Sequence, residues 1–146
     1  MSAAFVDTNV LVYAADAGDR RKHDTARALL RSLGPERTMV SAQVLAEYAS
    51  VMTHPRKGAR RARDVAAHVA RMHLAWRVVS LNAEIVLAAL EAQERWGLAY
   101  YDAQIWASAV LGGVSVVLSE DFSDGATLGG IRFADPFAGG FDIGSL

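Results

Sequence analysis

The chain has 146 residues, of which 52% are hydrophobic and 21% charged, and it contains 3 prolines. This composition excludes an intrinsically disordered chain and predicts one compact domain with a substantial core. The formal net charge of -1 neither indicates nor excludes a nucleic-acid partner, because a basic face beside an acidic site also sums to about zero.

Cysteine is absent, which excludes disulfide bonds and thiolate chemistry and fits a reducing compartment. The first residues lead directly into a predicted strand, with no basic segment followed by an apolar one, so we expect no signal peptide. The apolar runs are too short or too interrupted to span a bilayer. The sequence therefore predicts a cytoplasmic protein that does not bind membranes.

A buried strand opens the chain and passes directly into a helix. Residues 3–6 predict the strand, Asp7 stands at its carboxyl end, and the helix is expected to begin at Thr8 or Asn9. Ligands of open α/β sheets bind at the carboxyl ends of strands, which makes Asp7 a candidate functional residue. The elements expected next are a helix at 23–33, a strand at 38–40 and a helix at 42–52 that follows the N-cap Ser41.

The second half continues the alternation of helices and strands. Helical spacing and stop signals predict helices at 65–74, 83–96 and 100–111, and apolar runs predict strands at 76–81, 115–118 and 131–133. This order predicts an α/β fold with three layers, α/β/α, in which helices flank a mainly parallel sheet. We expect a single domain at 1–136 and a Gly-rich C-terminal tail at 137–146.

Asp102 lies on the apolar side of its predicted helix. With a step of about 100° per residue, Ala109, Trp106 and Ile105 lie within about 60° of it on the helical wheel. An uncompensated carboxylate there costs several kcal/mol unless it is neutralised, hydrogen-bonded or bound to a cation. Asp102 is therefore either paired with a buried group, caps a backbone, or belongs to a cation site.

Other acids stand near the same edge of the predicted sheet. Glu47 flanks the apolar face of a helix that begins at the carboxyl end of the second strand, and Glu120, Asp121 and Asp124 follow the strand at 115–118. Singly, these residues also fit a solvated helix and a polar turn. Together with Asp7 and Asp102 they indicate an oxygen-rich site for a hard divalent cation such as Mg²⁺.

Two basic segments are candidates for contacts with phosphate or with a protein partner. One contains Arg56, Lys57, Arg60 and Arg61 around Gly58, and the other is Arg20-Arg21-Lys22. The alternative for either segment is a solvated surface.

Four short segments resemble the motifs of PIN-domain ribonucleases, and most of all those of the VapC toxins of bacterial toxin–antitoxin pairs. The resemblance rests on residues 5–14 (FVDTNVLVYA), 41–47 (SAQVLAE), 101–103 (YDA) and 118–122 (LSEDF), in this order. The fourth segment departs from the commonest pattern, which has Thr where Ser119 stands.

The resemblance implies an acidic quartet of Asp7, Glu47, Asp102 and Asp121, with Asp124 as the substitute for Asp121. Thr8, Asn9 and Ser119 would support these acids. The activity implied is cleavage of RNA phosphodiester bonds by a water activated by Mg²⁺ or Mn²⁺, in a homodimer inhibited by a small antitoxin. Arg56, Lys57, Arg60 and Arg61 would then contact the RNA.

Three alternatives differ in function. A phosphorylation-switched receiver domain is disfavoured, because Asp7 has no acidic neighbour and no Lys follows Lys57. A PIN nuclease that processes RNA without an antitoxin and a catalytically inactive PIN fold that binds RNA or a partner both remain open.

Overall fold

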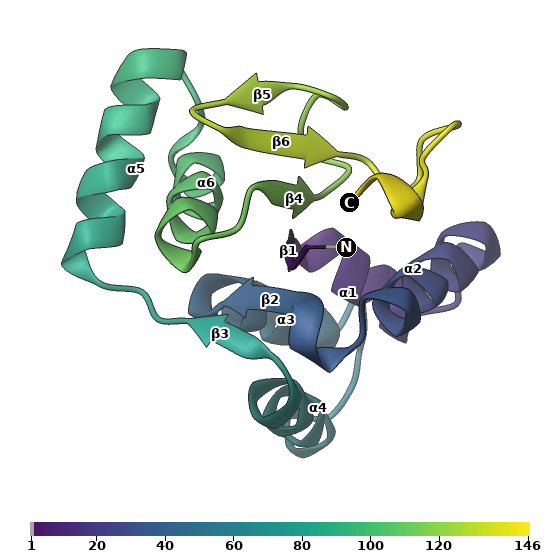
Figure 1. The fold of residues 1–146 in the computed structure, drawn as a ribbon. Coiled ribbons are helices and arrows are strands. Elements are labelled where there is room, and N and C mark those ends of the chain that lie inside the picture. The colour runs from purple at the N-terminus through teal and green to yellow at the C-terminus, as the bar shows by residue number, and fades with distance from the viewer. Residues whose placement is uncertain (1) are drawn as a thin grey trace.

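The structure is a computed structural model that describes residues 2–146. Within these residues, six strands form one sheet of order β3-β2-β1-β4-β6-β5 (Figure 1). The strands are β1 (Ala4–Val6), β2 (Thr38–Ser41), β3 (Arg77–Val79), β4 (Val116–Leu118), β5 (Thr127–Leu128) and β6 (Ile131–Ala134). All neighbouring pairs are parallel except β5 and β6, which are antiparallel. The mainly parallel sheet predicted from the sequence is thus confirmed.

Six α-helices flank this sheet in the described part of the chain: α1 (Thr8–Ala15), α2 (Arg20–Leu33), α3 (Ala42–Thr53), α4 (Ala62–Ala75), α5 (Ala83–Trp96) and α6 (Tyr100–Gly112). Helix α1 packs against α2 and α3, and α3 packs against α4, whereas α5 and α6 form a helical hairpin at the left of Figure 1. The fold is the three-layer α/β/α domain that the alternation of elements predicts. From residue 2 to residue 146, no helix has the length and apolar character needed to cross a membrane.

The helix ends follow from local hydrogen bonds. The Ser41 hydroxyl accepts the N–H of Val44 at 3.2 Å and starts α3, and the Asn82 side chain accepts the N–H of Ile85 at 3.0 Å and starts α5. Helix α2 begins three residues before the expected 23, because Asp19 accepts the N–H of Lys22 at 3.1 Å and caps it.

Strand β5 was not predicted. It forms a tight hairpin with β6 around Gly129 and Gly130, whose φ angles of +53° and +82° suit a two-residue turn. A Cβ on Gly129 would lie 2.8 Å from Trp96 and 2.9 Å from Trp106, so the close packing of the hairpin on α5 and α6 also requires glycine there.

The main core lies between the sheet and the helices and continues under the C-terminal residues. Phe5, Leu118 and Phe133 are almost completely buried in it. Phe137 is 6% exposed, and further apolar side chains of the tail pack against the same core, namely Phe141, Ile143 and Leu146. A smaller apolar cluster fills the α5–α6 hairpin.

Gly58 lies in the turn after α3 and donates its N–H to the Val51 carbonyl at 3.2 Å. A Cβ at Gly58 would lie 2.5 Å from the Met52 Cα, which is backbone and has no room to move. We expect Gly58→Ala to lower the free energy of unfolding by about 2–3 kcal/mol in urea denaturation.

Gly112→Ala is the matched control for this prediction. Its Cβ would lie 2.5 Å from the terminal methyl of Met39, which can change rotamer. We expect a loss of about 1 kcal/mol or less for Gly112→Ala. Equal losses for the two variants would contradict the assignment of Gly58 to a backbone contact.

Candidate active site

Asp7 lies where the direction of strand addition reverses. Strand β1 has β2 on one side and β4 on the other, and the side chain of Asp7 leaves the carboxyl end of β1 at this switch point. Its Oδ1 accepts the N–H of Thr8 at 2.8 Å, and its Oδ2 accepts the hydroxyl of Ser119 at 2.7 Å. Because Thr8 begins α1 and Ser119 follows β4, these bonds fix the carboxylate between two adjacent strands.

Asp7 is a buried carboxylate with a raised pKa. The residue is 5% exposed, and its burial raises the pKa of the carboxyl group to about 6. The hydrogen bonds from Ser119 and Thr8 lower this pKa in part, while the negative charges of Asp121 and Glu47 raise it further. Asp7 therefore lies among other acids in a poorly solvated place.

Asn9 and Ser119 connect Asp7 to Asp121. The Asn9 Nδ2 donates to Ser119 Oγ at 3.0 Å and to Asp121 Oδ2 at 3.1 Å. The Ser119 hydroxyl also accepts the N–H of Asp121 at 3.0 Å. These contacts hold the exposed Asp121 near the buried Asp7.

Glu47 approaches the same place from α3. Its Oε2 accepts the hydroxyl of Thr8 at 2.8 Å, and its Oε1 accepts the side-chain amide of Gln43 at 2.9 Å. The carboxylate is partly buried, and both of its oxygens are held by neutral donors. Thr8 thus links Glu47 to the N-terminus of α1, directly beside Asp7.

Asp102 lies in the first turn of α6 and is partly buried. Its burial raises its pKa, and the negative charges of Asp121 and Glu47 raise the pKa further. Within the predicted quartet, the charges of Asp121 and Glu47 therefore disfavour the ionised forms of both Asp7 and Asp102. Within residues 2–146, none of the four forms an ion pair with a Lys, Arg or His side chain.

An open cleft of about 440 Å³ lies at two of the four acids, Glu47 and Asp121. Its lining comes from α1, α3 and the segment after β4, and consists of Thr8, Asn9, Val12, Tyr13, Glu47, Ser50, Val51 and Asp121. The lining includes polar and apolar side chains and two carboxylates, Glu47 and Asp121, from different segments of the chain.

The other two acids of the fourth motif have different partners. Glu120 forms an ion pair with Lys22 at 2.7 Å and accepts the Tyr13 hydroxyl at 2.6 Å. Asp124 lies in an exposed turn, where it accepts the N–H of Asp135 at 2.9 Å. The structure therefore connects Asp121, and not Asp124, to the hydrogen bonds around Asp7.

The sequence did not indicate Gln43 or Gln104, and it gave Lys22 only as a candidate contact for phosphate or a partner. Gln43 and Gln104 are buried and hydrogen-bonded to each other at 2.8 Å, and Tyr13 and Lys22 hold Glu120. Gln43 had a detectable signal, because it precedes Glu47 by four residues on a helix and so lies on the same face.

The predicted basic segment lies in the turn between α3 and α4. Arg56, Lys57 and Arg61 are exposed, and Arg61 lies 3.9 Å from Asp64. Arg60 is partly buried, because its guanidinium donates to the Ala15 carbonyl at 2.5 Å and so caps the end of α1. Of the second basic segment, Lys22 is held by Glu120, and Arg21 donates to the Phe137 carbonyl at 3.3 Å.

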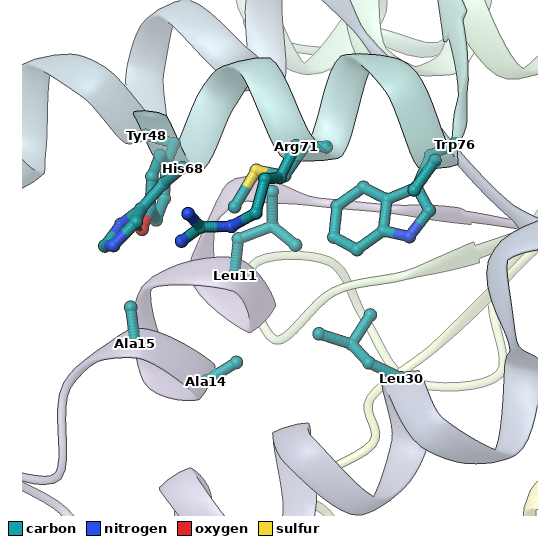
Figure 2. A pocket seen from close by; sticks show the side chains of 10 residues that line it. Leu11, Ala14, Ala15, Leu30, Tyr48, His68, Arg71 and Trp76 are labelled. Carbon is teal, nitrogen blue, oxygen red and sulfur yellow. Dashed lines mark hydrogen bonds between the residues drawn. The ribbon is translucent and has the colours of Figure 1, made fainter. Parts of the chain in front are cut away.

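A second cavity is separate from the acidic cleft. Its volume is about 350 Å³. Figure 2 shows Leu11 of α1, Leu30 of α2 and Trp76, which directly follows α4, facing this groove. At one end of it the Tyr48 hydroxyl and His68 Nδ1 lie 3.1 Å apart. None of the four predicted acids lines the groove, so it takes no part in the acidic site.

The donor set of the acidic site fits a hydrated divalent cation. No three Asp, Glu or His side chains in the described residues converge tightly enough to coordinate one ion directly. Mg²⁺, however, keeps several of its waters and is bound through one or two carboxylates. Buried Asp7, with acidic neighbours and no basic partner among residues 2–146, is the kind of group that such an ion stabilises.

The chain matches the sequence profile of one protein family. The sequence profile of the PIN domain matches residues 4–123. No curated protein sequence is significantly similar to the chain.

Several solved structures have the same fold. The chain is 27% identical to VapC20 of Mycobacterium tuberculosis, described as a sarcin-ricin loop cleaving toxin, with a TM-score of 0.62 over 79% of this chain and 87% of that one. It is 21% identical to a chain of a toxin–antitoxin complex from Klebsiella pneumoniae, with a TM-score of 0.67 over 92% and 98% of the two chains. DNA-bound VapBC of Salmonella typhimurium gives 19% identity and a TM-score of 0.66 over 93% and 99%. The chain therefore belongs to the PIN domain family, and it has the fold of the VapC toxins.

Proposed function

We propose that the chain is a metal-dependent endoribonuclease and the toxin of a toxin–antitoxin pair, acting in the cytoplasm. The observation that carries this proposal is the proximity of Asp7, Glu47, Asp102 and Asp121, none of which forms an ion pair with a basic side chain among residues 2–146. Membership of the PIN family and the likeness to VapC20, which is described as a sarcin-ricin loop cleaving toxin, support it.

In this proposal, Asp7, Glu47, Asp102 and Asp121 hold Mg²⁺ or Mn²⁺, and Thr8, Asn9 and Ser119 fix the orientation of the acids. The bound ion would activate a water and neutralise negative charge on the phosphate. Because Mg²⁺ keeps several of its waters, it does not require three side chains that coordinate it directly.

The chain itself contributes orientation and proton transfer. Asp7 and Glu47 have their oxygens fixed by neutral hydrogen-bond donors, so they need no reorganisation when a cation enters. One of the partly solvated carboxylates accepts the proton of the attacking water as a general base. Asp121 is the most exposed of the four and faces the cleft, which suits it to this step.

Binding of RNA requires positive charge outside the acidic cleft. We assign this role to Arg56, Lys57, Arg60 and Arg61, whose turn follows the helix that carries Glu47. Contacts of this kind are made to phosphates and weaken as salt concentration rises. The guanidinium of Arg60 also donates to the Ala15 carbonyl and so caps the C-terminus of α1.

The protein partners in this proposal are a second copy of the chain and a cognate antitoxin. The structures from Klebsiella pneumoniae and Salmonella typhimurium are complexes of toxin with antitoxin, which supports the second assignment. Co-expression with the product of an adjacent small gene, followed by measurement of the mass of the complex, tests both. A nuclease that processes RNA without an antitoxin would purify alone.

The experiment that tests the activity compares Asp121→Asn with Asp124→Asn in cleavage of single-stranded RNA with Mg²⁺ or Mn²⁺. We expect Asp121→Asn to lower kcat by at least about 100-fold, because it removes a charge from the site. Asp124→Asn should keep kcat within about 3-fold, since its side-chain oxygen still accepts the N–H of Asp135. Equal losses would contradict the assignment of Asp121, and a parent protein that cleaves no RNA would refute the proposed activity.

A further inference from the structure

Gln43 is a buried polar residue that contacts two of the four site segments. It lies in the first turn of α3 and is 9% exposed. Its Nε2 donates to Glu47 Oε1 at 2.9 Å and to the Tyr101 carbonyl at 3.3 Å. Tyr101 directly precedes Asp102, so this one amide group touches a site carboxylate and the backbone beside another.

The orientation of the Gln43 amide is determined by its surroundings. Glu47 Oε1 and the Tyr101 carbonyl are acceptors, so only the nitrogen of Gln43 can face them. Its Oε1 in turn accepts Gln104 Nε2 at 2.8 Å, and Gln104 is 3% exposed. Among residues 2–146, no buried side-chain polar atom of this network lacks a partner.

A buried pair of amides is not required for packing α3 against α6. Apolar side chains of similar volume would fill the same space without the desolvation that buried amides require. The donors of Gln43 are instead directed at the acidic site, where Thr8 holds the second oxygen of Glu47 from α1 at 2.8 Å. Gln43 and Thr8 thus fix both oxygens of one carboxylate from different elements.

We propose that Gln43 is a positioning residue whose amide group orients the Glu47 carboxylate and sets its separation from Asp102. The inference rests on the proposed nuclease function, because it assigns Gln43 a role in that site. Hydrogen-bonding partners of metal-binding carboxylates influence metal affinity and activity by about 10- to 100-fold. Gln43 would be such a partner, because it contacts Glu47 of α3 and the Tyr101 carbonyl of α6.

The test compares Gln43→Met with Gln104→Met. Gln43→Met keeps the length of the side chain and removes both donors, whereas Gln104→Met disturbs the same buried network and leaves the bond between Gln43 and Glu47 in place. Three quantities are measured for each variant: the thermal midpoint without metal, kcat and KM for RNA cleavage with Mn²⁺, and the crystal structure.

We expect a larger loss in thermal midpoint for Gln43→Met, which removes the hydrogen bonds to Glu47, Tyr101 and Gln104, than for Gln104→Met, which removes only the last of these. For Gln43→Met we expect kcat to fall about 10- to 100-fold with KM within about 2-fold, and Glu47 to change rotamer in the crystal structure. For Gln104→Met, kcat should stay within about 3-fold of the parent value, with Glu47 unmoved.

Three results would overturn the inference: unchanged kcat in Gln43→Met, an equal fall of kcat in both variants, or a Glu47 carboxylate that stays in place without the Gln43 amide. Failure of the proposed function is a different outcome. In that case the parent protein cleaves no RNA, and the position of Glu47 in the two crystal structures alone decides whether Gln43 positions it.

Discussion

Asp7→Asn is expected to make the metal-free protein more stable at pH 7 while removing its activity. Burial raises the pKa of Asp7 from 3.8 to about 6, which amounts to about 3 kcal/mol against the ionised form in the folded state. Asn is an equally good N-cap for α1 and still accepts the N–H of Thr8. The amide nitrogen of Asn cannot accept the Ser119 hydroxyl as the second oxygen of Asp7 does. Loss of this hydrogen bond costs about 1 kcal/mol. The expected net gain at pH 7 is about 2 kcal/mol.

The pH dependence of this effect has a definite sign. Between pH 3.8 and about 6 the folded protein keeps a proton on Asp7 that the unfolded chain has released. The stability of the parent protein therefore falls as pH rises through this window, and the full penalty remains above pH 6. The Asn variant lacks this fall, so the difference in stability between the two proteins changes by about 2.4 kcal/mol from pH 4 to pH 7.

Urea denaturation at several pH values without divalent ions measures the stability of both proteins. Cleavage of RNA by Asp7→Asn should be at least about 100-fold slower than by the parent, since a charged group of the site is gone. A variant that is less stable than the parent at pH 7, with a parallel pH profile, would show that Asp7 is a structural acid.

Mn²⁺ and Mg²⁺ are expected to stabilise the parent protein and to have little effect on Asp102→Asn. An ion that binds only the folded state stabilises it by about 2.7 kcal/mol at 100 times its Kd. For a chain of 146 residues this corresponds to a rise in thermal midpoint of roughly 5–10 °C. Removing Asp102 takes away one of the charges that attract the ion, so both the heat of binding and the rise should shrink.

Titration calorimetry and thermal unfolding measure this effect, with Asp124→Asn as control. Asp124 is exposed and bonded to Asp135, so its variant should respond to the ions as the parent does. Below pH about 6, protonation of Asp7 competes with the ion, and the apparent Kd should rise about tenfold per pH unit. If the ions change the heat of binding and the thermal midpoint equally in the parent and in Asp102→Asn, Asp102 does not hold the cation. The cation then binds elsewhere or only together with RNA.

The helices were predicted well because their ends carry local signals. Ser41, Asn82 and Gly97 act as the caps that their residue types suggest, and each signal lies within four residues of the boundary it sets. Strand β5 was missed because two residues, Thr127 and Leu128, show no periodicity. The Gly129-Gly130 turn is the local sign of this hairpin.

The acids of the site were accessible to sequence analysis, but their partners were not. Asp102 was conspicuous because a carboxylate on an apolar helix face requires an explanation. The bond between Ser119 and Asp7 spans 112 residues and exists only because β4 lies beside β1, which local patterns do not reveal. For the same reason the sequence left Asp121 and Asp124 as alternatives, which the contact of Asn9 with Asp121 distinguishes geometrically.

The central position of β1 has a consequence for the synthesis of this protein. Strand β1 is made first, yet one of its two neighbours, β4, ends at Leu118, and Asp121 comes later still. A nascent chain that stops before β4 contains Asp7, Glu47 and Asp102. It lacks Asp121 and the strand that pairs with β1 on the side opposite β2. We therefore expect a chain truncated before β4 to lack the arrangement that holds Asp7 beside Asp121, so the proposed site forms only after residue 121 has been made.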